Sequence, residues 1–322
     1  MKAIVVSKTG GPEVLELADQ EPGAPGAGHV RVRVRAVGVN YIDIYFRTGL
    51  YPRPLPFVAG LEGAGTVEAL GPGVTSLALG DRVAWASVPS SYAESVVAPV
   101  DRLVRVPAGI ADDVAAAAML QGMTAHYLCR ATYVVKAGDT ALVHAAAGGV
   151  GLLLVQMLRE IGATVIATCS TADKEKLAVE AGANHVIRYT EGDFADPVRK
   201  LTNGRGVAVV YDGVGRSTFD GSLRSLRPRG MLVLYGQASG PVPAFELRRL
   251  NDLGSLYITR PSLAHYTQDR AELELRAGEV LGAIAAGRLH VRIGAKFALA
   301  DAAAAQRALE GRATTGKVLL TT

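Results

Sequence analysis

A glycine-rich turn lies near the middle of the chain, where its residue types could hold a phosphate group. The segment from His144 to Gly151 reads H-A-A-A-G-G-V-G, with Ala146 in the first glycine position of the usual G-x-G-x-x-G pattern. A short apolar run, 140–143, precedes it, and a segment of helix-forming composition, 152–160, follows. Such a strand, turn and helix can receive a pyrophosphate at the helix N-terminus. Because a glycine-rich turn is often only a structural device, the motif alone leaves both interpretations open.

The residues after the next expected strand bear on which nucleotide would fit. Nineteen positions beyond Gly151 stands Ser170, where an acidic side chain would bind the ribose hydroxyls of NAD. Ser170 and Thr171 offer hydroxyl groups and Lys174 a positive charge, which favours NADP(H). Asp173 could partly offset that charge, although it more simply caps a helix or faces solvent. Lys174 as an ordinary solvated lysine is the alternative.

Composition limits the remaining classes of function. The chain of 322 residues is long enough for two domains, and its net charge of +4 includes no long run of like charges. Basic clusters without interleaved aromatics argue against nucleic-acid binding as the main task. The two cysteines, Cys129 and Cys169, build neither a disulfide framework nor a zinc lobe. The uncharged run 140–158 is interpreted as strand, turn and helix rather than a membrane span. We expect a soluble, cytoplasmic protein.

Periodicity predicts two kinds of architecture. Residues 1–106 alternate short β-type runs with Gly and Pro, which predicts a mostly antiparallel β domain. Residues 111–129 have helical composition. Beyond them strands and helices alternate, which predicts a parallel, doubly wound α/β sheet. The strands expected there are 140–143, 164–169, 185–188, 207–211 and 231–235, followed by a β-type run at 256–259. Residues 270–287 are expected to be helical, and 291–322 to add strand, helix and strand to the first domain.

Two segments, 38–49 and 60–65, resemble the medium-chain dehydrogenase/reductase superfamily. Its zinc alcohol dehydrogenases carry a cysteine where this chain has Asn40, and a G-H-E-x-x-G motif where it has Gly60-Leu61-Glu62. Catalytic zinc needs three protein ligands. With Asn40 and Leu61 in the ligand positions, and no histidines at ligand spacing, no metal site is expected.

Within this superfamily the chain is most similar to the zinc-free NADPH:quinone oxidoreductases, which include zeta-crystallin. Segments along the whole chain carry the resemblance: 38–43, 49–52, 120–124, 144–151, 210–215, 254–262 and 312–316. The resemblance implies an α/β protein with two domains. A GroES-like, mostly antiparallel β catalytic domain would comprise 1–122 and 261–322, and an NADP-binding Rossmann domain 123–260. It also suggests a homodimer formed through the strand at 256–259, although a capped sheet edge fits the same sequence.

The resemblance also implies which residues bind the cofactor NADPH and the substrate. Asn40 and Tyr45 would lie beside the nicotinamide and the substrate, with Thr124 at the cofactor. The pyrophosphate would be held by Gly148, Gly149, Val150 and Gly151, the adenosine phosphate by Ser170, Thr171, Lys174 and Tyr189, and the nicotinamide end by Tyr235, Gly236, Ile258, Arg260 and Arg312. From local sequence alone, Tyr189 is equally an ordinary loop tyrosine, and Arg260 and Arg312 are equally surface arginines.

The expected reaction is metal-free hydride transfer from C4 of NADPH to a quinone in a cleft between the domains. Asn40 and Tyr45 are suited to hydrogen-bond the quinone oxygen as negative charge develops. Tyr45 would act as electrophilic stabiliser or proton relay, and the final proton could come from water. Reduction of an enone or enoyl thioester is the alternative within enzymes. A structural or RNA-binding protein is the alternative of another class.

Overall fold

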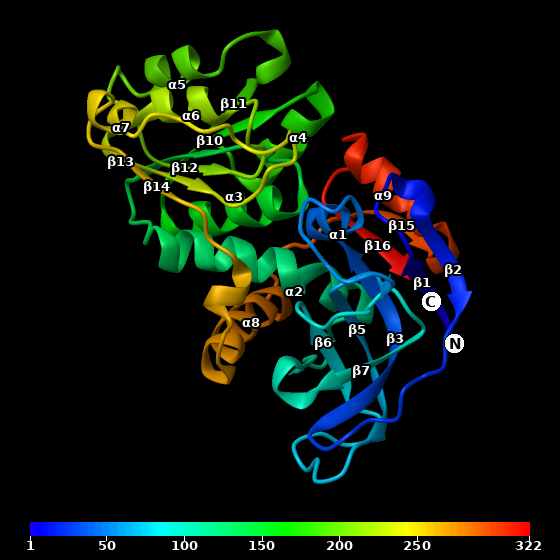
Figure 1. Ribbon diagram of the computed structural model, residues 1–322. Coiled ribbons are helices and arrows are strands. Elements are labelled where there is room, and N and C mark those ends of the chain that lie inside the picture. The colour runs from blue at the N-terminus through cyan, green and yellow to red at the C-terminus, as the bar shows by residue number, and fades with distance from the viewer. The chain divides into compact units, whose positions relative to one another are not determined.

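Valine alternates with polar residues from His29 to Arg35, in the first part of the longest strand of the protein. In β3 (His29–Val39) the valines are buried and the arginines half-buried or exposed, as expected of a sheet with one solvated face. The computed structural model describes residues 1–322 apart from the side chain of Glu191, and the chain folds into two units (Figure 1). The first unit comprises residues 1–123 and 267–322, and the second comprises residues 124–266.

The first unit contains two β-sheets. The larger has the order β15-β16-β3-β5-β6-β8 with β7 also paired to β3, and the smaller has the order β2-β1-β4. All of these pairings are antiparallel except β15 with β16. The strands are β1 (Lys2–Val6), β2 (Leu15–Asp19), β3, β4 (Phe57–Val58), β5 (Glu62–Leu70), β6 (Arg82–Trp85), β7 (Ser95–Pro99), β8 (Val104–Arg105), β15 (Ile293–Ala298) and β16 (Lys317–Thr321). The helices are α1 (Tyr41–Arg47), α2 (Asp112–Tyr127, which ends in the second unit), α8 (Arg270–Ala285) and α9 (Ala302–Glu310).

The second unit is a single parallel sheet with helices. Its strand order, β11-β10-β9-β12-β13-β14, is the doubly wound order. Successive strands are added on one side of β9 as far as β11 and then on its other side from β12 onward, so the strand order reverses between β9 and β12. The strands are β9 (Thr140–Val143), β10 (Thr164–Cys169), β11 (His185–Arg188), β12 (Val207–Asp212), β13 (Leu226–Leu234) and β14 (Tyr257–Thr259), and the helices are α3 (Gly149–Ile161), α4 (Ala172–Ala181), α5 (Ala195–Leu201), α6 (Phe219–Ser225) and α7 (Arg248–Asp252). Helices α3 and α4 pack together, as do α5 and α6. The predicted α/β class, with an antiparallel β unit and a doubly wound unit, is confirmed.

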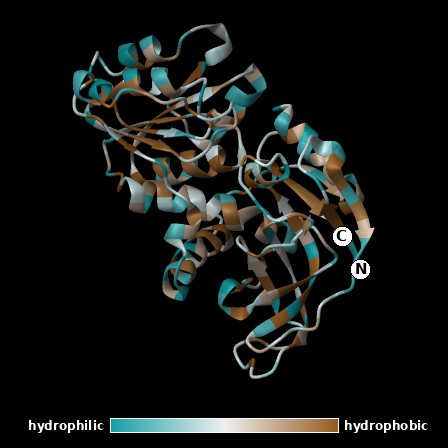
Figure 2. Cartoon of the chain, viewed as in Figure 1, coloured by the Kyte–Doolittle hydropathy of each residue, from teal (hydrophilic) through white to brown (hydrophobic). Residues whose placement is uncertain are grey.

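Each unit has its own apolar core, and Figure 2 shows apolar residues concentrated along the strands of both units. Short helical turns complete the chain at Pro12–Val14, Val100–Arg102, Leu128–Thr132, Tyr189–Glu191, Leu263–Tyr266 and Leu299–Asp301. Within the described part of the chain, no helix has both the length and the apolar character needed to cross a membrane.

Candidate functional site

Strand register in the first unit brings three polar side chains together at the start of α1. Gly38 of β3 pairs with Glu62 of β5, and Val39 pairs with Val318 of β16. Asn40 follows Val39 and Lys317 precedes Val318, so the antiparallel register places Lys317 beside Asn40. Gly38 is required at this point, because a Cβ there would lie 2.1 Å from Glu62 Oε2.

Asn40, Glu62 and Lys317 form a closed hydrogen-bonded group, called here the Asn40 triad. The Lys317 ammonium pairs with Glu62 and donates to Asn40 Oδ1 at 2.7 Å, while Asn40 Nδ2 donates to Glu62 Oε2 at 2.8 Å and to Gly38 O at 3.2 Å. Glu62 Oε1 accepts from the backbone N–H of Leu120 at 2.6 Å. The Lys317 and Glu62 side chains are 1% and 0% exposed. Both amide hydrogens of Asn40 are therefore engaged within the protein.

Asn40 is also the N-cap residue of α1, and Asp43 stabilises this end of the helix. Asp43 Oδ2 accepts from the backbone N–H of Asn40 at 2.9 Å and from the Tyr92 hydroxyl at 3.0 Å. Asp43 Oδ1 is buried and has no hydrogen-bond partner among the described residues. Burial raises the pKa of Asp43 to about 7, a rise that the two hydrogen bonds and the Lys317 charge only partly oppose.

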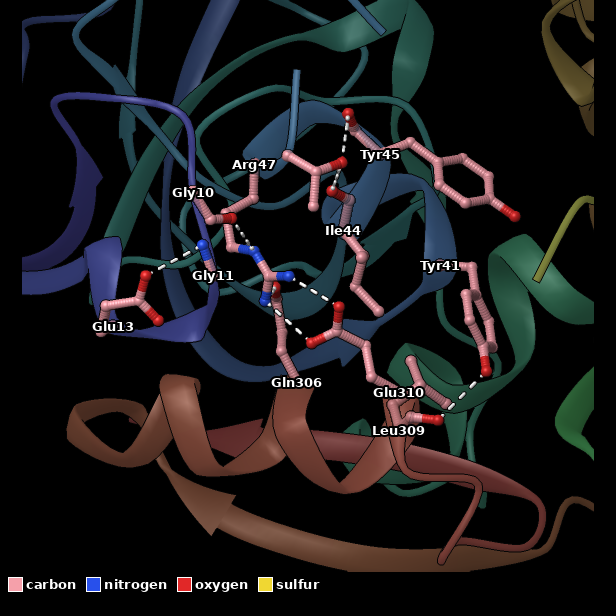
Figure 3. Close-up of polar contacts among 11 residues, drawn as sticks. Gly10, Gly11, Glu13, Tyr41, Ile44, Tyr45, Arg47, Gln306, Leu309 and Glu310 are labelled. Atoms are coloured by element: carbon pink, nitrogen blue, oxygen red, sulfur yellow. Dashed lines mark hydrogen bonds and ion pairs between the residues drawn. The ribbon is translucent and has the colours of Figure 1, made fainter. Parts of the chain in front are cut away.

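Tyr45, the other residue proposed for catalysis, lies in an aromatic group on α1 and the segment after it. Its ring is 5.1 Å from that of Tyr51 in an edge-on arrangement and 6.3 Å from that of Tyr41, centroid to centroid. Tyr45 is 8% exposed. Figure 3 shows its ring directed away from the Arg47 guanidinium on the same helix. Both residues named for catalysis therefore lie in one short segment.

In the second unit, the glycine turn follows β9 at the point where the strand order of the sheet reverses. Such a reversal opens a crevice at the carboxyl ends of the strands, where ligands bind in doubly wound folds. Helix α3 begins at Gly149 with Gly148 as its N-cap residue, and no side-chain hydrogen bond caps its positive end. A Cβ on Gly151 would lie 2.4 Å from Ala145 O and 2.7 Å from Ala146 Cα. This uncapped helix end and close backbone approach fit a pyrophosphate at Gly148, Gly149, Val150 and Gly151.

The structure explains why alanine replaces the first glycine of the motif. The left-handed conformation falls on Ala145, with φ +49°, and not on Ala146. Ala146 is fully buried, and its N–H donates to Thr168 O at 3.1 Å. A methyl group is therefore accommodated at Ala146 without backbone strain.

A buried polar network that sequence reasoning missed supports this turn. Thr168 Oγ1 lies 2.8 Å from His144 Nδ1, and His144 Nε2 lies 3.0 Å from Ser222 Oγ, which donates to Asp212 Oδ2 at 3.0 Å. Because Ser222 uses its hydrogen on Asp212, it accepts from His144, which fixes the Nε2–H tautomer. Burial lowers the pKa of His144, consistent with a neutral ring. The sequence signal that could have indicated this network was His144, a histidine directly after the apolar run 140–143.

Residues around the end of β10 fit a phosphate on the adenosine ribose. Lys174 Nζ lies 3.4 Å from Ser170 Oγ. The Thr190 hydroxyl donates to Ser170 O at 3.1 Å, so Thr190, the residue after Tyr189, is held at this strand end. Thr171 has a structural task, because its hydroxyl caps α4 by accepting from Lys174 N at 3.3 Å. Asp173 is exposed and pairs with Lys176. The strand end thus carries a hydroxyl and a cation within hydrogen-bonding distance of each other.

The remaining predicted cofactor residues lie at the ends of other elements. Tyr235 and Gly236 follow β13, and a Cβ on Gly236 would lie 2.6 Å from Gly213 O. Ile258 is in β14, and just beyond it Arg260 donates to Leu234 O at 3.0 Å. Thr124 is buried in α2. Arg312 follows α9 with φ +55°. Contact of these residues with a cofactor stays a prediction.

The donor set around Asn40 is chemically unlike a zinc site. Asn40 and Leu61 replace soft ligands, and the Lys317 ammonium already neutralises Glu62. No group of three or more His, Cys, Asp or Glu side chains that could hold a metal ion occurs among the described residues.

Comparison with known proteins identifies the family. A family model for the alcohol dehydrogenase GroES-like domain matches residues 26–139, and one for zinc-binding dehydrogenases matches residues 149–274. A quinone oxidoreductase of Pseudomonas aeruginosa is 47% identical over 321 residues, 99% of each chain. A 2-haloacrylate reductase of a Burkholderia species is 44% identical over 99% of this chain and 98% of its own. The structure of Escherichia coli quinone oxidoreductase complexed with NADPH aligns with a TM-score of 0.98 at 42% identity, covering all of both chains.

The presence of Asn40 and Leu61 in the metal-ligand positions, the glycine turn at the reversal of strand order and this full-length similarity agree with one another. The chain belongs to the quinone oxidoreductases of the medium-chain dehydrogenase/reductase superfamily.

Proposed function

We propose that the protein reduces quinones with NADPH by hydride transfer that needs no metal. The observation that carries this proposal is the full-length similarity to quinone oxidoreductases, one of which was solved with NADPH. NADPH supplies the hydride from its nicotinamide C4, and the protein supplies binding, orientation and a suitable electrostatic environment. A quinone accepts hydride readily, because the product oxygen carries its negative charge without strong polarisation by a metal.

The residues of the second unit hold the cofactor in this proposal. The uncapped N-terminus of α3 and the glycines around it receive the pyrophosphate. Ser170 and Lys174 receive the ribose phosphate, with Tyr189 beside them and Thr171 capping the helix that carries Lys174. Thr124, Tyr235, Gly236, Ile258 and Arg260 complete the cofactor contacts that we propose for this unit, and Arg312, which belongs to the first unit, is proposed as a further contact.

In the first unit, the proposed catalytic roles of Asn40 and Tyr45 differ. The Tyr45 hydroxyl hydrogen-bonds the quinone oxygen as negative charge develops there. Asn40 lies at the same helix start, but its two amide hydrogens are engaged by Glu62 and Gly38. A hydrogen bond from Asn40 to a substrate would have to replace one of these, so its main contribution is to orient the segment that carries Tyr45.

Reduction of an activated alkene is the second candidate. It requires the same hydride donor, and the 44% identity to a 2-haloacrylate reductase favours it specifically. Steady-state NADPH oxidation should therefore be measured side by side with 1,4-benzoquinone, 1,4-naphthoquinone, 2-chloroacrylate and a simple enone. We expect the larger kcat/KM with the quinones. A larger kcat/KM with the alkenes would favour the second candidate, and no oxidation with any acceptor would refute both.

We further propose a homodimer, formed by pairing of the sheet edge at β14, and a cytoplasmic location. The proposal of a dimer is supported by the exposure of Tyr257 in this edge strand, which is 56% exposed. Light scattering after size exclusion tests the dimer, since a monomer at all concentrations would exclude it. Cell fractionation tests the location.

A further inference from the structure

Helix α1, which carries Tyr45, is too short to be stable by itself. It has seven residues, about two turns, and isolated helices of this length do not persist in water. Its conformation must therefore come from contacts with the rest of the first unit. Those contacts decide where the Tyr45 hydroxyl lies.

The C-terminal end of α1 is held by a buried arginine, shown in Figure 3. The Arg47 guanidinium donates to both oxygens of Glu310, at 2.7 and 3.1 Å, and to Gln306 Oε1 at 2.9 Å. It also donates to Gly10 O at 3.2 Å. Arg47 is 1% exposed. This forked contact with a carboxylate fixes direction as well as distance, which a point charge would not do.

The N-terminal end of α1 is held by a second buried cation. Lys317 fixes Asn40, the N-cap residue of α1, through the Asn40 triad. Between the two cations, the Tyr41 hydroxyl donates to Leu309 O at 3.1 Å. All three contacts lead from α1 or its N-cap residue to a single segment, residues 306–317, which comprises the end of α9, the connecting loop and the first residue of β16.

We propose that Arg47 and Lys317 are positioning residues, which orient Tyr45 for hydride transfer by anchoring both ends of α1 to residues 306–317. The inference rests on the proposed function. Apolar replacements of a whole buried ion pair are often neutral or stabilising, so a contribution to core stability does not by itself account for these two pairs. What the two pairs supply is a fixed geometry. Arg47 acts through the helix, since the Tyr45 ring points away from the Arg47 guanidinium in Figure 3.

The test compares Arg47→Lys, which keeps the charge but loses the fork, with the double variant Lys317→Met/Glu62→Gln, which removes both charges together. Lys296→Met is the matched control, because it breaks the half-exposed pair of Lys296 with Asp113 in the same unit. Each protein is assayed for NADPH-binding stoichiometry, for kcat and KM with 1,4-benzoquinone, and for the isotope effect with NADPH deuterated at both C4 positions.

We expect kcat to fall about 10- to 100-fold in both test variants, the range expected when a catalytic group is displaced by about 1 Å. The fraction of chains that bind NADPH should stay at the wild-type value, and the isotope effect on kcat should rise, because hydride transfer becomes slower relative to other steps. The control should match the wild type. A kcat that falls only in proportion to the binding fraction, with an unchanged isotope effect, would overturn the inference. An inactive wild type would instead refute the proposed function, and the inference with it.

Discussion

Replacement of Asp43 by asparagine should remove a pH dependence of folding stability. The carboxyl group of Asp43 is buried, and desolvation raises its pKa from 3.8 to about 7 against the hydrogen bonds from Asn40 and Tyr92. Lys317 lowers this pKa and Glu62 raises it. In the unfolded chain the same group titrates near its ordinary value. The folded state therefore binds more protons between about pH 4 and pH 7, and stability falls as pH rises through this window.

The magnitude follows from the two pKa values. At about 1.4 kcal/mol per pKa unit, the full cost of ionising Asp43 in the folded protein is about 4 kcal/mol, and about 2.5 kcal/mol of it appears between pH 5 and pH 8. The amide that replaces the carboxyl group stays neutral at both pH values. Asp43→Asn should therefore gain about 2.5 kcal/mol in free energy of unfolding, relative to wild type, on going from pH 5 to pH 8.

Urea unfolding of both proteins at several pH values measures this difference. Asp113→Asn is the matched control, because the Lys296 contact lowers the pKa of Asp113 below its ordinary value of 3.8. Its contribution is lost only under more acidic conditions, so the difference between this variant and wild type should be the same at pH 5 and pH 8. A free-energy difference between wild type and Asp43→Asn that is the same at pH 5 and pH 8 would refute the reasoning.

Three further predictions test the second unit and the sheet edge. Lys174→Ala should weaken NADPH binding on the order of tenfold and leave NADH binding unchanged, as one charge-assisted hydrogen bond to the ribose phosphate is lost; equal losses in a fluorescence titration would contradict the assignment. Gly151→Ala should abolish NADPH binding in calorimetric titration, because the new Cβ would lie 2.4 Å from Ala145 O; normal binding would be inconsistent with the turn described. The matched control is Gly278→Ala in α8, whose Cβ would meet nothing within 4 Å and which should stabilise the protein by up to about 1 kcal/mol in thermal unfolding. Tyr257→Lys should convert the proposed dimer to monomers in light scattering, and a dimer of undiminished affinity would place the interface elsewhere.

The doubly wound unit could be predicted from sequence because its signals are local. The strands at 140–143, 164–169 and 185–188 have the predicted bounds, since each is a short β-type run between a turn and a helix. The class of the first unit was also predictable from its alternating apolar residues. Strand β13 begins earlier than expected, at Leu226, because pairing with β12 extends through a register shift into the polar segment that precedes Gly230.

The contacts that hold the site residues in place could not be predicted in the same way. Lys317 is 255 residues from Glu62 and Arg47 is 263 residues from Glu310, so only the strand register and the packing of α9 bring them together. A lysine before an apolar strand and an arginine in a short helix look like ordinary solvated residues. The relation of His144 to Ser222 and Asp212 has the same origin, because the order of the parallel sheet, and not the spacing along the chain, makes β9 and β12 neighbours.

The most direct test of the proposed function is single-turnover oxidation of NADPH by 1,4-benzoquinone, without oxygen and after exhaustive treatment with a metal chelator. The account predicts that chelated protein oxidises NADPH as fast as untreated protein, and that deuterium at both C4 positions slows the reaction. Loss of activity on chelation, or oxidation that is insensitive to deuterium, would contradict metal-free hydride transfer.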